Sequence, residues 1–190
     1  MKKVVIIDNY DSFTYNLVHL VNEILQEEVD VIRNDQFELD YFKKYEYIIL
    51  SPGPGVPDEA GDLKAVIKEY ASSKKIFGVC LGLQAIGEVF GGKLKNLSKV
   101  FHGMKTQIHK TKNHDPILEG IGDLFEAGRY HSWVIDLDYI PSDLIVTATD
   151  SIGEVMAARH KSYNVHGVQF HPESIMTPDG KQMIINFLNL

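Results

Sequence analysis

Short β-branched runs alternate with helical patterns over the first 90 residues, and this alternation constrains the fold more than any other feature of the chain. Strand-like runs lie at 4–7, 29–32, 47–50 and 76–79. Apolar residues with helical spacing lie at 12–25, 59–72 and 81–90, with Ser12 as the expected N-cap of the first helix. Strands joined through helices pair in parallel, and the helices cover the sheet. We therefore predict an α/β fold with a mostly parallel central sheet and helices on both faces.

The pattern changes near residue 93, where strand-like runs separated by turn residues replace the alternation. These runs lie at 93–101, 104–110, 123–128, 134–137, 143–149, 153–160 and 164–170, and a helix is predicted over 180–188. The sequence has no internal repeat and no linker, and 190 residues suit one domain. We predict that residues 1–190 form a single domain in which the later strands extend the sheet.

Charge and cysteine content exclude several classes of function. The chain has 19 Lys and Arg against 26 Asp and Glu, and a net charge of −7 would repel a phosphate backbone, so no nucleic-acid partner is expected. The apolar run before Asp8 is too short for a signal peptide or a membrane span. Cys80 is the single cysteine, so no internal disulfide or paired-cysteine zinc site is possible. We expect a cytoplasmic protein with no membrane association, no metal and no cofactor.

The segment 78–82, Gly-Val-Cys-Leu-Gly, is the most informative motif. It joins a predicted strand to a predicted helix, which is the setting of a nucleophile elbow, with Cys80 in the place of serine. The flanking glycines are needed because side chains there would collide with neighbouring backbone. The helix N-terminus favours a thiolate over a thiol. The alternative is a small buried side chain at a strand end, the commonest role of a free cysteine.

A thiolate nucleophile needs a proton carrier, and His171 is the best candidate. It stands at the end of the last strand-like run, with the carboxylate of Glu173 two residues further on. Together with Cys80 these residues suggest a Cys–His–Glu triad in which Glu173 orients the imidazole. A structural histidine at a strand end is the alternative. The pair His131-Ser132 suggests a serine nucleophile, but it lacks the glycines of an elbow.

The segment 51–55, Ser-Pro-Gly-Pro-Gly, can continue neither a strand nor a helix. It lacks the Gly-Lys-Ser/Thr of a phosphate-binding loop. Its glycines let backbone N–H groups approach a substrate oxygen, and with the N–H of Leu81 they suit an oxyanion hole. A rigid turn is the alternative. In an open α/β sheet this segment, 8–12 and 78–82 all lie at the carboxyl ends of the strands, where ligands bind.

Three motifs together resemble the class I, triad-type glutamine amidotransferases, and the resemblance spans essentially the whole chain. They are 51–55, 78–84 (Gly-Val-Cys-Leu-Gly-Leu-Gln) and 167–174 (Gly-Val-Gln-Phe-His-Pro-Glu-Ser), in the order and spacing of that family. Segments 8–16 and 129–132 narrow the resemblance to the small subunits of anthranilate synthase and aminodeoxychorismate synthase, and argue against the amidotransferase subunit of guanylate synthesis. The resemblance implies a flavodoxin-like arrangement of the sheet.

The resemblance also implies roles for individual residues. The expected catalytic residues are Cys80 as nucleophile, His171 and Glu173. The residues expected to bind L-glutamine, through the oxyanion or through its α-amino and α-carboxylate ends, are Gly53, Pro54, Gly55, Leu81, Gln84, Ser132 and Trp133. Leu83 and Trp133 depart from the residues usual in the family, but neither replaces a catalytic group.

A partner follows from the same resemblance. Ammonia released from glutamine is expected to enter a channel in a large chorismate-binding synthase subunit, since this chain shows no chorismate site of its own. Segments 8–16 and 102–107 are the candidate docking regions. Anthranilate is the favoured product, and aminodeoxychorismate, or service to both synthases, is the alternative. A stand-alone cysteine hydrolase of γ-glutamyl compounds and a non-catalytic interaction subunit represent other classes of function.

Overall fold

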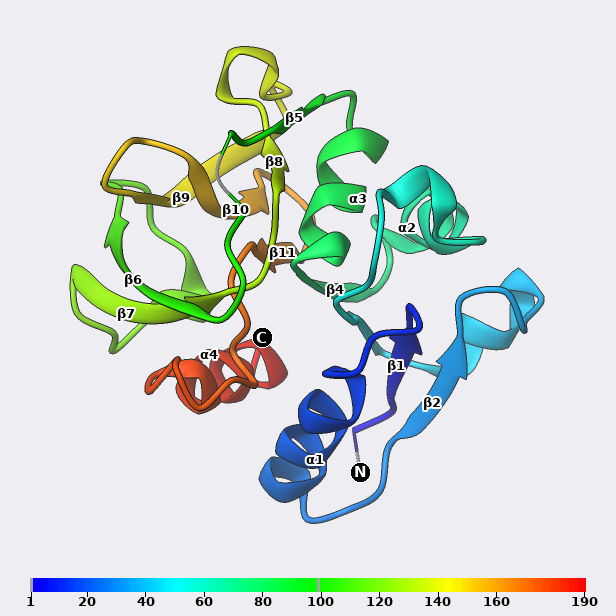
Figure 1. Cartoon of the computed structure of the whole chain (residues 1–190). Helices are drawn as coiled ribbons and strands as arrows, with labels where there is room; N and C mark the ends of the chain where they lie inside the picture. The colour runs from blue at the N-terminus through cyan, green and yellow to red at the C-terminus, as the bar shows by residue number, and fades with distance from the viewer. Residues whose placement is uncertain (1, 99) are drawn as a thin grey trace.

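The computed structural model describes residues 2–98 and 100–190, which form a mixed nine-stranded sheet covered by helices (Figure 1). The strand order is β2-β1-β3-β4-β11-β10-β9-β6-β7, and β5 and β8 form a separate two-stranded ribbon. The strands are β1 Val4–Asp8, β2 Asp30–Arg33, β3 Tyr47–Leu50, β4 Lys75–Val79, β5 Leu94–Asn96, β6 Met104–Lys110, β7 Leu124–Arg129, β8 Trp133–Ile135, β9 Leu144–Asp150, β10 Val155–His160 and β11 Val165–Val168. The α-helices are α1 Thr14–Leu25, α2 Leu63–Tyr70, α3 Leu81–Val89 and α4 Gly180–Leu188, and the 3-10 turns are η1 Leu39–Lys44, η2 Pro57–Glu59, η3 Pro116–Leu118 and η4 Leu137–Tyr139.

Five neighbouring strands, β2, β1, β3, β4 and β11, run parallel to one another. Their order corresponds to the 2-1-3-4-5 order of flavodoxin-like sheets. β1 and β3 are buried at every position, which explains why they are continuous apolar runs rather than alternating ones. The predicted α/β fold is confirmed.

Helices cover both faces of this parallel half. Successive side chains of a strand point to opposite faces, so Val4 and Ile6 pack in one apolar cluster with α1 and α4, whereas Val5 and Ile7 pack in another with α2 and α3. Figure 1 shows α1 beside α4, and α2 beside α3, as two separate pairs. The odd and even positions of β1 therefore both belong to the core.

The later strands extend the same sheet, as predicted, and they do so in the antiparallel sense, which the sequence pattern did not specify. β11 pairs in parallel with β4 and antiparallel with β10, and the ladder continues antiparallel through β9, β6 and β7. Although β11 comes last in the sequence, it lies between the two halves of the sheet. The chain that leaves β11 therefore emerges beside the chain that leaves β4.

Three local predictions were wrong or too long. Residue Ser12 is not the N-cap of α1, because Phe13 occupies that position and no side chain caps the helix. The turn before α1 is held instead by Asp11, which accepts from the Phe13 N–H, and by Asp8, which accepts from the Thr14 hydroxyl. The helix predicted over 59–72 is divided into η2 and the shorter α2, with Gly61 at φ +53° between them. The strand predicted over 93–101 is reduced to β5, and Lys99 lies outside the described residues.

Candidate active site

Loops that follow β1, β3 and β4 meet at the carboxyl edge of the parallel strands. The loop after β1 is tied to the loop after β3, because the Asn9 backbone N–H donates to the Ser51 hydroxyl over 2.9 Å and the Asn9 side-chain amide donates to the Ser51 carbonyl over 2.8 Å. The amide of Asn34 donates to Asn9 in turn, over 3.0 Å. This buried amide network holds the predicted glycine-rich segment beside the start of α3.

Cys80 occupies a strained turn between β4 and α3. Its backbone has φ 52° and ψ −101°, a conformation that is costly for a residue with a Cβ. The neighbouring glycines permit this turn: a Cβ on Gly78 would lie 2.5 Å from the backbone of Gly82, and one on Gly82 would lie 2.8 Å from the Leu50 carbonyl oxygen. Cys80 is only 5% exposed and stands at the N-terminus of α3, the strand-to-helix position of a nucleophile elbow.

His171 is held by backbone contacts just beyond β11. Its N–H donates to the Gly128 carbonyl over 3.0 Å, and its carbonyl accepts from the Thr177 hydroxyl over 2.6 Å. The 171–177 turn is closed further by the Ser174 N–H, which donates to the His171 carbonyl over 3.2 Å. The imidazole is therefore positioned by β7 as well as by its own loop.

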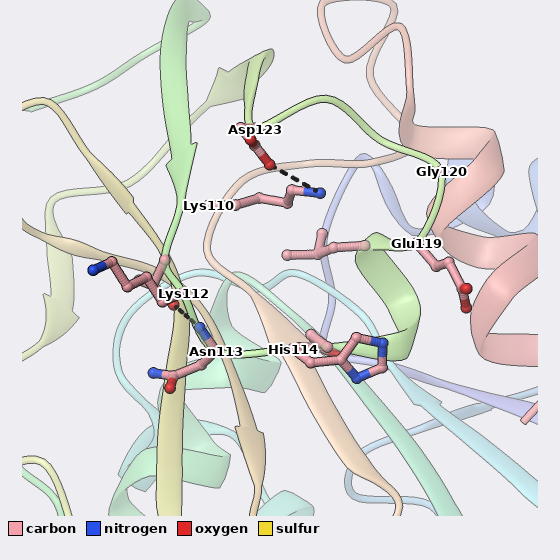
Figure 2. A pocket seen from close by; sticks show the side chains of 10 residues that line it. Lys110, Lys112, Asn113, His114, Glu119, Gly120 and Asp123 are labelled. Atoms are coloured by element: carbon pink, nitrogen blue, oxygen red, sulfur yellow. Dashed lines mark hydrogen bonds and ion pairs between the residues drawn. The ribbon is translucent and has the colours of Figure 1, made fainter.

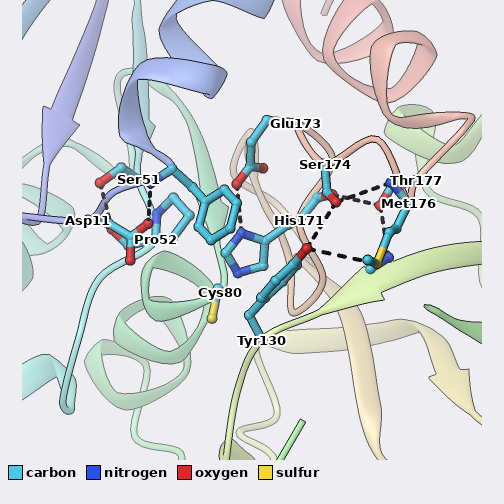
Figure 3. Close-up of polar contacts among 12 residues, drawn as sticks. Asp11, Ser51, Pro52, Cys80, Tyr130, His171, Glu173, Ser174, Met176 and Thr177 are labelled. Carbon is cyan, nitrogen blue, oxygen red and sulfur yellow. Dashed lines mark hydrogen bonds and ion pairs between the residues drawn. The ribbon is translucent and has the colours of Figure 1, made fainter. Parts of the chain in front are cut away.

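The imidazole of His171 lies between a carboxylate and the thiol (Figure 3). Nδ1 donates to Oε1 of Glu173 over 2.6 Å, with both side chains buried. Among the described residues, Nε2 has no hydrogen bond of normal geometry, although it is buried and directed toward Cys80. Burial lowers the pKa of His171, but interactions with Cys80 and Glu173 outweigh it and raise that pKa to about 10. These neighbours favour the protonated form of the imidazole.

Two aromatic rings enclose the imidazole. The centroid of the His171 ring lies 5.3 Å from Phe13 and 4.8 Å from Tyr130, and the rings of Phe13 and Tyr130 are 4.8 Å apart. Phe13 comes from the loop after β1 and Tyr130 directly follows β7. Neither residue was predicted as part of the site. The rings limit rotation of the imidazole and keep water from it.

The glycine-rich segment reaches the start of α3 at Gly53. A Cβ on Gly53 would lie 2.7 Å from the Cβ of Asn9 and would collide with the side chain of Leu81, so only glycine fits. Pro54 and Gly55 are exposed at the rim. Leu81 is the first residue of α3, where a backbone N–H has no partner inside the helix. The expected oxyanion donors are thus neighbours.

The residues expected to hold the amino-acid end of glutamine lie in α3 and at the start of β8. Nε2 of Gln84 donates to the Trp133 carbonyl over 2.9 Å, which connects the second turn of α3 to β8. Ser132 precedes β8, is half-buried, and accepts at its carbonyl from the Leu97 N–H over 2.7 Å. The described contacts therefore connect Gly53, Gln84 and Trp133 to the first turns of α3, whereas Pro54, Gly55 and Ser132 make no described contact with Cys80.

Gln169 is a further polar residue at the site that was not predicted. It is fully buried, and its Nε2 donates to Sγ of Cys80 over 3.4 Å. The motif at 167–174 contained a signal for this position. Residues two apart at the end of a strand share a face, and Gln169 precedes His171 by two, so the Gln169 side chain could have been expected on the same side as His171. Arg129 was also missed. It pairs with Asp150 over 2.8 Å and donates through Nε to Nε2 of His131 over 3.0 Å, and all three side chains are buried.

A cavity of about 340 Å³ lies away from these residues, beside β6 and η3 (Figure 2). Its lining includes Lys110, Asn113 and His114, and none of the predicted site residues. Asp115 at its edge pairs over 2.8 Å with His166 in β11, five residues before His171. This cavity is therefore toward the opposite end of β11 from the candidate site.

The fold and the site define a class: α/β proteins with a cysteine elbow at the carboxyl edge of a parallel sheet, next to a histidine paired with a glutamate. The family model described as glutamine amidotransferase class-I matches residues 5–190. The chain belongs to the class-I glutamine amidotransferase family, as the resemblance of its motifs predicted.

Individual relatives narrow the comparison. "Aminodeoxychorismate/anthranilate synthase component 2" of Bacillus subtilis is 46% identical over 97% of this chain and 95% of its own length. "Bifunctional protein TrpGD" of Thermotoga maritima is 40% identical over all of this chain, which spans 32% of that protein. Among solved structures, a GMP synthase component from Thermoplasma acidophilum superposes with a TM-score of 0.88 at 24% identity, covering 100% of this chain and 93% of that one. This last likeness concerns the fold alone.

Proposed function

We propose that this chain hydrolyses L-glutamine through a thioester on Cys80 and delivers the ammonia to a chorismate-aminating synthase. The observation that carries the proposal is His171, which is bonded to Glu173 at Nδ1 and turns its other ring nitrogen toward the thiol of a strained elbow. The raised pKa of His171 favours an imidazolium beside a thiolate. A thiolate, unlike a thiol, can attack an amide.

The reaction follows from these charges. Sγ of Cys80 attacks the side-chain amide carbon of glutamine, and the carbonyl oxygen becomes an oxyanion near the backbone N–H groups of Gly53 and Leu81. The imidazolium of His171 gives its proton to the departing nitrogen, the C–N bond breaks, and ammonia leaves. Neutral His171 then takes a proton from water, which attacks the thioester to give glutamate and regenerate the thiolate.

Recognition of the amino-acid end of glutamine is supported by the surroundings of Gln84 and Trp133. The two hydrogen bonds described for the Gln84 amide use Nε2, which leaves Oε1 to accept from an α-ammonium group. A groove of about 470 Å³ includes Trp133, but neither Cys80 nor Gln84 lines it, and its Lys64 already pairs with Asp58 and Glu88. The free oxygen of the Gln84 amide therefore carries this part of the proposal.

The ammonia acceptor is proposed to be a large chorismate-binding synthase subunit. Relatives that this chain matches over nearly their whole length are named component 2 of anthranilate or aminodeoxychorismate synthase, which supports a partner component. Free ammonia in water is mostly ammonium, so a channel to the acceptor would preserve the nucleophile. Exposed apolar side chains occur in both candidate docking segments, Tyr10 and Tyr15 in 8–16 and Met104 in 102–107.

Anthranilate and aminodeoxychorismate remain the two candidate products, and we propose anthranilate first because more of the relatives carry that name. The product formed with each large subunit of the same organism decides between them. Turnover as fast without any synthase as with one would instead favour a stand-alone hydrolase.

We also propose that residues 1–190 act as one glutamine amidotransferase domain in the cytoplasm. The unbroken ladder from β2 to β7 supports one domain. A free cysteine at the centre of the site suits a reducing compartment. Within the described residues, no helix has the length and apolar character needed to cross a membrane.

The test is Cys80→Ser, assayed together with the synthase. Glutamine-dependent synthesis is expected to fall to background, while synthesis from added ammonium salt stays at the wild-type rate because the acceptor site is elsewhere. Equal loss of both activities would contradict the proposed division of labour. Glutamine-dependent synthesis at the wild-type rate would show that Cys80 is not the nucleophile.

A further inference from the structure

A buried chain of amide groups ends on the sulfur of Cys80. Nε2 of Gln169 lies 3.4 Å from Sγ, and Oε1 of Gln169 accepts from Nε2 of Gln84 over 3.3 Å. The Gln84 amide donates in turn to the Trp133 carbonyl, over 2.9 Å. Gln169 has no exposed surface and Gln84 is 3% exposed, so water does not compete for these bonds.

The Trp133 carbonyl determines which atom donates and which accepts in every hydrogen bond of this chain of amides. A backbone carbonyl can only accept, so the Trp133 oxygen requires the N–H₂ end of Gln84. The second proton of that N–H₂ group requires the oxygen end of Gln169. The amide of Gln169 therefore turns its own N–H₂ end toward Sγ, and the sulfur receives a hydrogen bond. A donated hydrogen bond favours the charged thiolate over the neutral thiol.

A second set of buried groups holds the Trp133 carbonyl in place. It also accepts from Nδ1 of His131 over 3.0 Å, and Nε2 of His131 accepts from Nε of Arg129 over 3.0 Å. Arg129 is anchored by Asp150 over 2.8 Å. An arginine can only donate, so His131 is neutral with its proton on Nδ1, in agreement with its lowered pKa. These hydrogen bonds form one polar relay that connects Arg129, a permanent cation, to Cys80 through His131, the Trp133 carbonyl, Gln84 and Gln169. The donor and the acceptor of each bond in the relay are fixed.

We propose that Gln169 is a catalytic residue that donates a hydrogen bond to the Cys80 thiolate, with its amide aligned by Gln84 and the Trp133 carbonyl. The inference rests on the proposed role of Cys80 as nucleophile. Gln169 stabilises the thiolate before it attacks glutamine and again when hydrolysis of the thioester releases it. Because Gln84 is also the residue proposed to bind the α-ammonium group of glutamine, its amide would connect substrate binding to the sulfur.

Gln169→Met tests the donor, since methionine keeps the length and volume of the side chain without the N–H group. Hydrogen bonds to charged groups predict a fall of about 10- to 100-fold in the kcat for glutamine hydrolysis, with KM nearly unchanged. Alkylation of Cys80 by iodoacetamide, measured without glutamine, is expected to slow in parallel, and the ultraviolet absorbance of the thiolate to decrease. Gln182→Met, on the exposed face of α4, is the matched control and should change neither rate.

Gln169→Asn serves where the methionine variant fails to fold, as judged by circular dichroism, because it keeps an amide and withdraws the donor by one methylene. Equal alkylation rates and equal kcat values in wild type and a folded Gln169 variant would overturn the inference. If Cys80→Ser is inactive at the same time, the proposed function still stands. An active Cys80→Ser variant would instead remove the basis of both.

Discussion

At the scale of single residues, the candidate site consists of groups whose charge and direction are set by burial. Interactions with Cys80 and Glu173 raise the pKa of His171 and favour its cation. Burial and Arg129 lower the pKa of His131 and favour its neutral form. Two histidines of one site thus have pKa values displaced in opposite directions. The neighbours of each imidazole, rather than its residue type, decide whether it carries a proton.

Glu173→Gln should lower the kcat for glutamine hydrolysis by about 10²- to 10⁴-fold with little effect on KM, because the carboxylate that orients Nδ1–H and stabilises the imidazolium is lost. The measurement is steady-state release of glutamate. Glu126→Gln, an exposed position in β7, is the control and should match the wild type. A Glu173→Gln variant with wild-type kcat would mean that another group orients His171.

The neutral state of His131 makes folding stability depend on pH. Burial first, and Arg129 second, lower the pKa of His131 from 6.5 to about 3, so between these values the unfolded chain binds a proton that the folded chain does not. Stability from this group is present above pH 6.5 and falls as pH decreases, by about 1.4 kcal/mol per unit. The stability advantage of wild type over His131→Gln, measured by urea unfolding, should shrink from pH 6.5 to pH 4. An advantage that does not change with pH would contradict this.

At the scale of elements, the junction between β4 and α3 is the part of the site whose backbone conformation is most restricted. The strand ends and the helix begins at Cys80, which has a positive φ. This turn is possible because the backbones of Gly78 and Gly82, and of Gly82 and Leu50, come so close together that a Cβ on either glycine would collide. The loops after β1 and β11 only have to bring Asn9 and His171 up to this junction. The elbow is therefore the least substitutable element of the site.

Gly78→Ala should destabilise the protein by about 3 kcal/mol and reduce glutamine hydrolysis, because the new methyl group would lie 2.5 Å from the backbone of Gly82. Denaturant unfolding and kcat are the measurements. Gly122→Ala is the control: its nearest neighbour would be the Leu124 carbonyl oxygen at 3.3 Å, so we expect a loss below about 1 kcal/mol. Equal stability of the two variants would show that the elbow relaxes without cost.

At the scale of the whole molecule, the last strand of the sequence joins the two halves of the sheet. β11 hydrogen-bonds to β4 on one side and β10 on the other, so neither half is complete without residues 165–168. The polar relay crosses the same boundary, from Arg129 in β7 through β8 and α3 to Gln169. Parallel and antiparallel halves therefore share one structural centre, which is also the candidate site.

A shared centre predicts a single cooperative unfolding transition. Calorimetry is expected to give one endotherm whose calorimetric and van't Hoff enthalpies agree. Two resolved transitions, or loss of near-ultraviolet dichroism from one half before the other, would contradict the prediction that residues 1–190 form one domain.

Much of the fold and part of the site could be predicted from sequence because the signals are local. Continuous apolar runs such as 47–50 belong to strands buried on both faces, and glycines two residues either side of Cys80 belong to a crowded turn. Ser12 was mistaken for a cap because the chain turns one residue later, at Phe13, where Asp11 and Asp8 hold the turn and no side chain caps the helix.

The sequence by itself determined the alternating elements, the elbow and the family. Tertiary structure alone decided which groups surround the sulfur. Residues 84, 133 and 169 are distant in sequence, so only the pairing of β11 with β4 brings Gln169 to Cys80, and only the approach of β8 to α3 supplies the Trp133 carbonyl that orients both amides. The physical reason is that a hydrogen bond depends on distance and direction within a few tenths of an ångström, which residue type and spacing do not specify.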